Sequence, residues 1–291
     1  MRKTGSRPWR FLNTGSGNAF FNMAVDEAIV RGVEEDTAPP TVRTFGWTPP
    51  AVSFGYAQRI AREVDADRCR ERGIQLVRRP SGGRAVLHWN ELTYSVTCRT
   101  DDPLLGGSIQ ESYRKISACL VASLQRLGVA ARFEPRRNPV SSPRGEGLTS
   151  PCFSSTTQYE VTIDDRKIIG SAQRRLGGVL LQHGSLLLGP EHKHLIDLMP
   201  DRRQLLKERF RRELDRHTVS LSEADRPADF HTVARALRGG FEETLDITLT
   251  ESTLSPEETA DAEHLVETKY GTESWNLGDG KRQPRIVRRI I

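Results

Sequence analysis

The chain has 291 residues, 36% of them hydrophobic and 28% charged, which is enough for one large domain or for one domain with a smaller partner. No apolar run approaches the ~18 residues of a spanning helix, and no apolar segment follows the basic N-terminus, so we expect a cytoplasmic protein without a membrane span or a secretory signal. The chain has 43 lysine and arginine residues against 38 aspartate and glutamate residues, and its isoelectric point near 9.2 permits an acidic partner, either a protein or nucleic acid. Nucleic acid is the less favoured of the two, because the sequence has no basic stripe with interleaved aromatic residues.

The first part of the chain alternates short strands with one amphipathic helix. A strand is predicted over Trp9–Asn13 and a helix over Asn18–Arg31, with Asn18 as its N-cap. Two β-rich runs follow, Thr41–Trp47 and Ala51–Tyr56, separated by Thr-Pro-Pro. This pattern predicts two consecutive strands of one sheet.

The next segment leads into a loop rich in arginine and glycine. An exposed helix is predicted over Glu63–Arg72, ended by a glycine, and a strand over Ile74–Val77. After the loop, Ala85–His88 and Leu92–Thr97 are predicted to pair as a hairpin.

The second half of the chain begins with the strongest helical signal and ends in charged helices. Apolar residues at helical spacing predict a helix over Ser108–Leu127, a strand over Val129–Phe133 and then a polar loop over Glu134–Thr149. Three further strands and three further helices are predicted: Tyr159–Ile163, Lys167–Ala172, Gly178–Leu188, Asp201–Leu214, Asp229–Phe241 and Pro256–Tyr270. Strands followed by helices indicate an α+β fold with a helical C-terminal extension, and the basic end from Gly278 onward is expected to be disordered.

The loop that reads RRPSGGR is a candidate cradle for an anion or a carbonyl group. Gly82 and Gly83 allow close approach of a ligand to the backbone, and Arg78, Arg79 and Arg84 add positive charge on both sides. The alternative is a plain turn between strands with solvated arginines. Because a strand, and not a helix, follows the loop, it is neither of the common nucleotide-binding glycine motifs.

Four cysteines are present without metal-ligand or disulfide spacing. Cys152 follows the polar loop, where access to substrate is expected, whereas Cys119 lies on the apolar face of a helix and is expected to be buried. Cys69 and Cys98 are expected to be bystanders. Lys167 lies past the next tight turn; an ammonium near a thiol favours the thiolate, although a solvated turn lysine is the alternative.

Histidines offer weaker candidates. His88 and His183 each lie in an apolar strand, which favours a hydrogen-bonded structural role over a catalytic base, with His183 a candidate pocket residue. His192 and His194 are expected at the surface of a helix start, and their spacing of two residues speaks against a shared metal ion. No Ser-His-Asp order of catalytic residues can be assigned from the sequence.

Several segments together resemble a known family. In chain order they read FNMAVDEAI, RRPSGGRAVLH, ELTYSV, PCF, RKIIGSAQRR and LLQHGSLLL, with KYGTESWN near the end. They are similar to the lipoate-protein ligase A and octanoyltransferase group of the biotin/lipoate ligase superfamily, and within it to the LipM type of octanoyltransferase. The resemblance implies a mixed β-sheet core flanked by helices, with a catalytic domain over residues 1–250 and a C-terminal helix and tail over residues 251–291.

The resemblance also assigns roles to residues of this chain. Cys152 matches the family's acyl-thioester nucleophile, and Lys167 matches the lysine thought to hold the acyl carbonyl and to favour the thiolate. The other implied pocket residues bind substrate: Arg78, Arg79, Ser81, Gly82, Gly83, Arg84, Ala85, Val86, His88, Gly170, Ser171, Ala172, His183 and Gly184.

The implied reaction moves octanoyl from octanoyl-acyl carrier protein to a lysine of a lipoyl domain, such as that of glycine cleavage H protein, with no cofactor and no metal. ATP-dependent ligases of the superfamily usually continue the loop with a third glycine and His-Asp, where this chain has Arg84 and His88-Trp89; Trp89 is unusual for the transferases too. Three alternatives remain: an ATP-dependent lipoate ligase, an amidotransferase between lipoyl domains, and a non-catalytic binder of acyl chains or nucleic acid.

Overall fold

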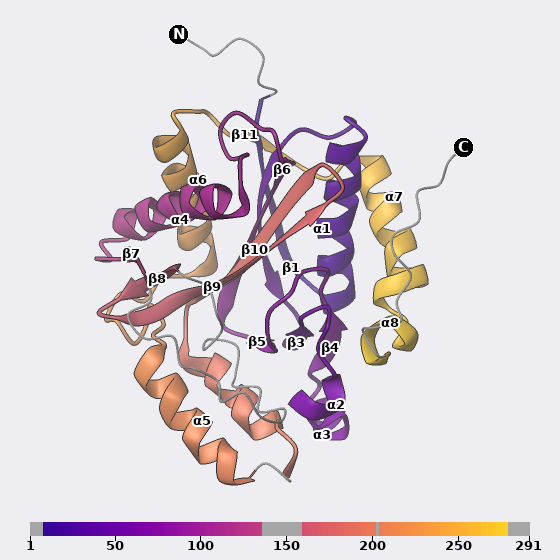
Figure 1. The fold of residues 1–291 in the computed structure, drawn as a ribbon, viewed down its shortest axis with the longest axis vertical. Helices are drawn as coiled ribbons and strands as arrows, with labels where there is room; N and C mark the ends of the chain where they lie inside the picture. Colours follow the sequence, from indigo (N-terminus) through magenta and orange to yellow (C-terminus); the bar gives the residue numbers. More distant parts are fainter. Residues whose placement is uncertain (1–7, 136–158, 202–203, 279–291) are drawn as a thin grey trace.

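A computed structural model describes residues 8–135, 159–201 and 204–278 of the chain (Figure 1). Two β-sheets and the helices packed on them make up these ranges, which confirms the α+β prediction. Within them, no helix is both long and apolar enough to cross a bilayer. Cys152, the greater part of the predicted polar loop and the basic C-terminal end lie outside the described residues.

The larger sheet has eight strands in the order β11-β1-β2-β6-β10-β9-β8-β7. It is mixed, because β1 runs parallel to both β11 and β2, whereas the other neighbours are antiparallel. The strands are β1 (Arg10–Gly17), β2 (Thr41–Trp47), β6 (Glu91–Arg99), β7 (Arg132–Pro135), β8 (Tyr159–Ile163), β9 (Arg166–Leu176), β10 (Val179–Leu187) and β11 (Thr250–Ser252). Asp164 and Asp165, both at positive φ, make the predicted tight turn between β8 and β9.

The smaller sheet has three strands in the order β4-β3-β5, and it corrects two predicted pairings. Its strands are β3 (Ala51–Phe54), β4 (Gln75–Arg78) and β5 (Val86–His88). The predicted neighbours β2 and β3 therefore lie in different sheets. The predicted hairpin of β5 with β6 is also wrong, because β2 and β10 pair with the two edges of β6 while β5 pairs with β3.

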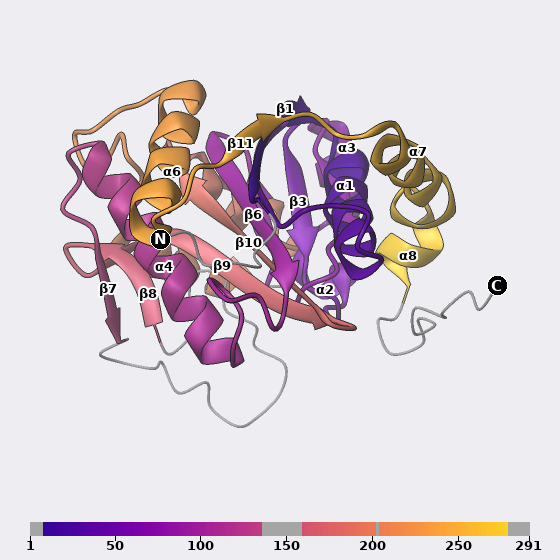
Figure 2. The ribbon, with the colours of Figure 1, turned by 90° about the horizontal axis from the view of Figure 1, so that it is seen from above.

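Helices cover both faces of the larger sheet. Figure 2 shows α1 and α7 on one side of it and α4 and α6 on the other. The helices are α1 (Ala19–Glu34), α2 (Ile60–Glu63), α3 (Ala66–Glu71), α4 (Ile109–Arg126), α5 (Gln204–His217), α6 (Phe230–Leu245), α7 (Pro256–Leu265) and α8 (Glu273–Leu277), with a 3-10 helix over Pro190–Leu198 and a π-helical turn over Val266–Tyr270.

Side-chain caps fix several helix starts that the sequence indicated. The Asn18 side chain accepts a hydrogen bond from the Phe21 amide at the start of α1, as predicted, and Ser108 forms a capping box with Glu111 at the start of α4. The helix predicted over Glu63–Arg72 is observed as α3, and the first predicted residue is the last residue of α2. Helix α3 begins later than predicted because Asp65 has an extended backbone and caps the helix by accepting a hydrogen bond from the Arg68 amide.

The C-terminal part of the chain packs onto the first helix and strand. Strand β11 pairs with β1, and the Glu258 carboxylate of α7 forms a buried ion pair with Arg10. The predicted domain boundary between residues 250 and 251 falls inside β11, and the division into two domains stays a prediction. One surface prediction is wrong: His192 is buried, and its Nε2 lies 2.9 Å from the Thr218 hydroxyl.

Candidate active site

A pocket opens where α1, the α1-facing side of the larger sheet and the smaller sheet meet. From the arginine and glycine segment and β5 it takes Arg79, Gly83, Val86 and His88. From β9 and β10 it takes Lys167, Gly170, Ser171, Ala172, His183, Gly184 and Ser185. The strands of two different sheets therefore bring together the residues that the sequence had placed far apart.

The Arg79 side chain stabilises the loop from inside by binding backbone carbonyls. Its guanidinium donates to the Gly82 carbonyl at 2.8 Å, to the Arg84 carbonyl at 2.7 Å and to the Ser53 carbonyl at 3.0 Å. Gly83 has a φ of +97°, and a Cβ there would lie 2.7 Å from the Arg79 guanidinium, so the loop needs glycine at this position. The alternative of solvated arginines is wrong for this residue.

Arg78 is also buried, but its side chain turns away from the pocket. It donates to the carbonyls of Tyr56 and Gln58 on one side and, on the other, to those of Trp275, Asn276 and Gly278 near the C-terminal end of the described chain. Five residues of this segment that the sequence analysis placed in the pocket do not line it: Arg78, Ser81, Gly82, Arg84 and Ala85.

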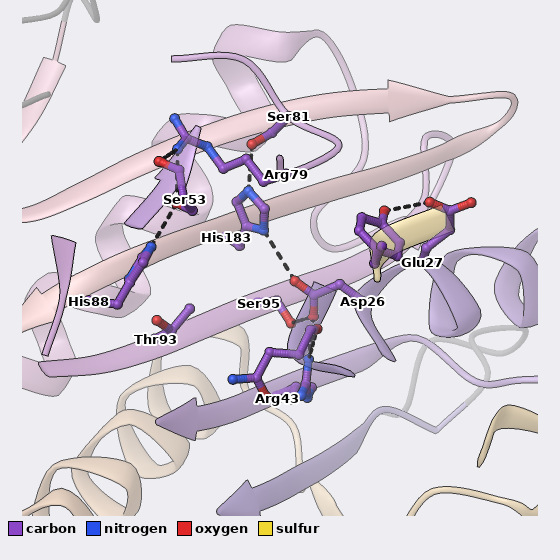
Figure 3. Close-up of polar contacts among 12 residues, drawn as sticks. Asp26, Glu27, Arg43, Ser53, Arg79, Ser81, His88, Thr93, Ser95 and His183 are labelled. Carbon is purple, nitrogen blue, oxygen red and sulfur yellow. Dashed lines mark hydrogen bonds and ion pairs between the residues drawn. The ribbon is translucent and has the colours of Figure 1, made fainter. Parts of the chain in front are cut away.

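A buried polar chain connects α1 to the loop through His183 (Figure 3). His183 Nδ1 lies 3.1 Å from an Asp26 carboxylate oxygen, and its Nε2 lies 2.5 Å from the Ser81 hydroxyl. Arg43 donates to the same carboxylate at 2.7 Å. Burial acts to raise the pKa of Asp26, but the hydrogen bond from His183 and the charge of Arg43 outweigh it and hold the pKa below its ordinary value.

The ionised state of Asp26 fixes the tautomer of His183. Because a carboxylate can only accept, Nδ1 of His183 donates a hydrogen bond to it, and in the neutral imidazole Nε2 accepts a hydrogen bond from the Ser81 hydroxyl. Ser95 adds a third donor to Asp26 at 2.9 Å, after His183 and Arg43. The result is a rigid wall that anchors the Ser81 end of the loop to the larger sheet.

His88 closes another part of the wall. Its ring stacks on Trp47 with centroids 4.0 Å apart, and its Nε2 lies 2.7 Å from the Ser53 hydroxyl. Burial lowers the pKa of His88, although Glu91 acts in the opposite direction, so the ring is neutral at pH 7. The structural role predicted for His88 is therefore met by specific partners.

Lys167 lies at the start of β9, buried, with its side chain on the pocket wall. Its Nζ is 2.9 Å from the Glu160 carboxylate on β8, and both side chains are nearly inaccessible. The alternative of a solvated turn lysine is therefore wrong. Glu160 was not predicted, because a single glutamate in a short strand carries no local signal.

The chain is similar to a family model and to curated relatives. Residues 18–242 match the family model described as the lipoyl protein ligase A/B catalytic domain. The chain belongs to this family. Octanoyltransferase LipM of Kyrpidia tusciae is 43% identical over 273 residues, which cover 92% of this chain and 98% of that protein. Octanoyltransferase LipM of Bacillus subtilis is 37% identical over 274 residues, with 92% and 97% covered.

Solved structures agree with the family assignment. Lipoate-protein ligase A bound with ATP superimposes with a TM-score of 0.76 at 28% identity, covering 94% of this chain and all of that one. The archaeal bipartite lipoate protein ligase from Thermoplasma acidophilum gives 0.77 at 27% identity, with 96% and 99% covered. With the curated relatives, these similarities identify the chain as an acyltransferase of the lipoyl protein ligase A/B family and confirm the likeness to the LipM type.

The family's first motif holds two residues that sequence reasoning missed. Asp26 and Glu27 lie on the buried side of α1, in an otherwise apolar stretch. Asp26 reaches His183, as described above, whereas Glu27 accepts from Lys269 and from the Tyr270 hydroxyl, each at 2.5 Å. Two adjacent acidic residues on an apolar helix face are a signal in themselves, because buried carboxylates require partners.

Three of the four cysteines are described, and each is buried. Burial raises the pKa of the Cys69 thiol to about 11 and that of Cys119 to about 12, and it raises that of Cys98 well above the ordinary value. These thiols stay protonated at neutral pH and are inert as nucleophiles. The predictions that Cys119 is buried and that Cys69 and Cys98 are bystanders agree with this placement.

Proposed function

We propose that the chain transfers octanoyl from octanoyl-acyl carrier protein to a lysine of a lipoyl domain, such as that of glycine cleavage H protein, through a thioester on Cys152. Supporting observations are the relatives named octanoyltransferase LipM and the pocket that contains Lys167 beside the loop and the polar wall. Lys167 is the main support for the proposal, because its buried side chain lines the pocket and could donate a hydrogen bond to an acyl carbonyl bound there. The cytoplasmic location belongs to the same proposal.

The first step forms the acyl-enzyme. The Cys152 thiolate attacks the carbonyl carbon of the octanoyl thioester, the bond to the pantetheine sulfur breaks, and that sulfur leaves and takes up a proton. The carbonyl oxygen becomes an oxyanion in the transition state, and Lys167 is a charged donor on the pocket wall that can stabilise it. A thioester is exchanged for a thioester, so no external energy source is required.

The second step forms the amide. The neutral amine of the acceptor lysine attacks the acyl-enzyme, the bond to Cys152 breaks, and the amine proton is passed on as the cysteine thiol is restored. An octanoyl tail offers about six methylenes at ~0.8 kcal/mol each, or roughly 5 kcal/mol of burial before ordering costs. Met23, Val86 and Ala172 supply apolar wall for such a tail.

The charge of the chain fits such partners. A net charge of +5 would steer acidic carrier proteins and acidic lipoyl domains towards the enzyme. The archaeal lipoylation system of Thermoplasma acidophilum pairs its bipartite lipoate protein ligase with an E2 lipoyl domain, which supports a lipoyl domain as the acceptor here.

The test is acylation of the intact protein. Incubation with octanoyl-acyl carrier protein is expected to add one octanoyl mass that hydroxylamine removes and that Cys152→Ser abolishes. A mass increase that survives Cys152→Ser places the nucleophile elsewhere. Pyrophosphate release that requires lipoate and Mg-ATP identifies an ATP-dependent ligase instead, transfer only from an octanoylated lipoyl domain identifies an amidotransferase, and tight acyl binding without turnover identifies a binder.

A further inference from the structure

The hydroxyl groups on the pocket wall, apart from one, are already used by the protein. Ser53, Thr93 and Ser171 each have a side-chain partner in the folded chain. Those partners are, in the same order, His88 at 2.7 Å, Glu91 at 2.6 Å and Tyr94 at 2.7 Å. Buried polar groups in folded proteins are nearly always paired in this way, so these hydroxyls are not free for a ligand.

The charged and ring groups on the wall are similarly engaged. Lys167 bonds Glu160, the Arg79 guanidinium binds backbone carbonyls, and both nitrogens of His183 have partners. The other nitrogen of His88, Nδ1, has no hydrogen bond of its own, but an equally unpartnered oxygen of Glu91 lies 3.5 Å from it. Each of these two atoms is therefore the nearest polar neighbour that explains why the other is not available to a ligand.

Ser185 is the exception. It lines the pocket from β10 and is only 3% exposed, and its Oγ has no hydrogen-bond partner among the described residues. Alternation along the strand places it on the same face as His183. Directly opposite it on β9 is Gly170, which has no side chain to cover the hydroxyl, and Lys167 lies three residues earlier on that strand.

We propose that the Ser185 hydroxyl donates a hydrogen bond to the carbonyl oxygen of the bound acyl group, alongside Lys167. This inference rests on the proposed function and names a further residue of that site. A fatty acyl chain brings one polar group into the pocket, a carbonyl that can only accept hydrogen bonds, and a buried hydroxyl without a partner complements it. The bond becomes stronger as charge develops on the oxygen in the transition state.

Kinetics of Ser185→Ala provide the first test. We expect kcat/KM for octanoyl transfer to fall about tenfold to a hundredfold, with most of the loss in kcat because the bond strengthens in the transition state. Ser185→Thr keeps the hydroxyl and should restore part of the rate. Ser123→Ala is the matched control, since Ser123 is an equally buried serine on α4 that bonds the Cys119 carbonyl away from the pocket, and its rate should equal that of the wild type.

Binding of an unreactive probe provides the second test. N-methyloctanamide labelled with carbon-13 at the carbonyl should show its infrared carbonyl band at lower frequency in the wild type than in Ser185→Ala, and should bind the variant about threefold to tenfold more weakly. An unchanged band with unchanged kinetics overturns the assignment, as does failure of the wild type to bind the amide.

The two tests separate this inference from the proposed function. A wild type that transfers octanoyl, with Ser185→Ala equally active and its carbonyl band unmoved, upholds the function and removes Ser185 from it. A wild type that transfers no octanoyl, but whose amide band depends on Ser185, removes the function and keeps the contact.

Discussion

The two faces of the central strands differ in chemistry although both are buried. On β6, Leu92 and Tyr94 pack into the apolar core under α4 and α6, whereas Thr93 lines the pocket and Ser95 bonds Asp26 on the α1 side. Strand β10 has the same division, with Leu180 and Leu186 on the apolar face. His183 and Ser185 lie on the pocket face of this strand.

This difference shows what a polar alternation can mean. Apolar and polar residues that alternate along a strand are typical of a sheet with one face in water. Here α1 covers the polar face of the sheet. The polar side chains of that face form hydrogen bonds with α1 instead of with solvent. The face that looks solvent-exposed in the sequence is the wall of the pocket, and the apolar face is the structural core.

The largest expected loss of stability comes from removing the buried carboxylate of Asp26 on the polar face. Asp26→Ala should lower the free energy of unfolding by about 3–5 kcal/mol, because it leaves the buried Arg43 without its carboxylate. Urea unfolding measures this change. Glu243→Ala, which removes an exposed ion pair with Arg126, is the control and should cost no more than about 1 kcal/mol. Equal stability of both variants would contradict the comparison.

A second substitution tests the apolar face. Leu120 on α4 is fully buried, and Leu120→Ala should cost about 2–5 kcal/mol of unfolding free energy through the cavity it leaves. Octanoyl transfer per folded molecule should be unchanged, since α4 contributes no residue to the pocket wall. Loss of kcat/KM at a temperature where the variant is fully folded would show that the two faces are not separable.

The pH dependence of stability sharpens the comparison further. Despite the opposing effect of burial, His183 and Arg43 hold the pKa of Asp26 below its ordinary value, so its contribution is complete above about pH 4, the value of the unfolded chain. The contribution is lost as pH falls through the lower folded pKa. The stability difference between wild type and Asp26→Asn should therefore shrink on acidification below about pH 4. Urea titrations that show a constant or widening gap would refute this account.

The smallest expected change in stability comes from removing a buried hydroxyl group on the apolar face. Thr44 of β2 is opposite Tyr94, is fully buried, and has a hydroxyl without a partner among the described residues. Valine has nearly the same shape as threonine, and Thr44→Val removes a buried hydroxyl that makes no hydrogen bond with the described residues. The free energy of unfolding should therefore be unchanged or rise by up to about 1 kcal/mol. Thermal unfolding detects it, and a marked loss of stability would reveal a partner for the hydroxyl.

Local signals allowed much of the fold to be predicted. Apolar residues at helical spacing placed α4 within a residue at each end, and the Asp164-Asp165 turn placed the β8 to β9 hairpin. The failures were pairings between strands: β5 and β6 are adjacent in sequence, but both edges of β6 are occupied by strands distant in the chain. Strand order depends on such distant partners, and no local pattern encodes them.

The candidate site was predictable only in part, and for the same reason. Lys167 was singled out by its position past the tight turn, and the family resemblance then gave it a role. The arginine and glycine loop was found from its composition, although Arg78 supports the fold instead of lining the pocket. Glu160 and Ser185 acquire their meaning only from neighbours on other strands. Asp26 and Glu27 were recognisable as buried charges in principle, but their partners are far away in the sequence.

The bonds of Arg78 have a consequence for biosynthesis. Three of its carbonyl acceptors belong to Trp275, Asn276 and Gly278, almost two hundred residues further along the chain. A nascent polypeptide emerging from the ribosome has no such acceptors until residues 275–278 have been synthesised. We therefore expect the arginine and glycine loop to gain these contacts only after residues 275–278 have been synthesised, so that a chain ending before Trp275 would lack them even where its strands have paired.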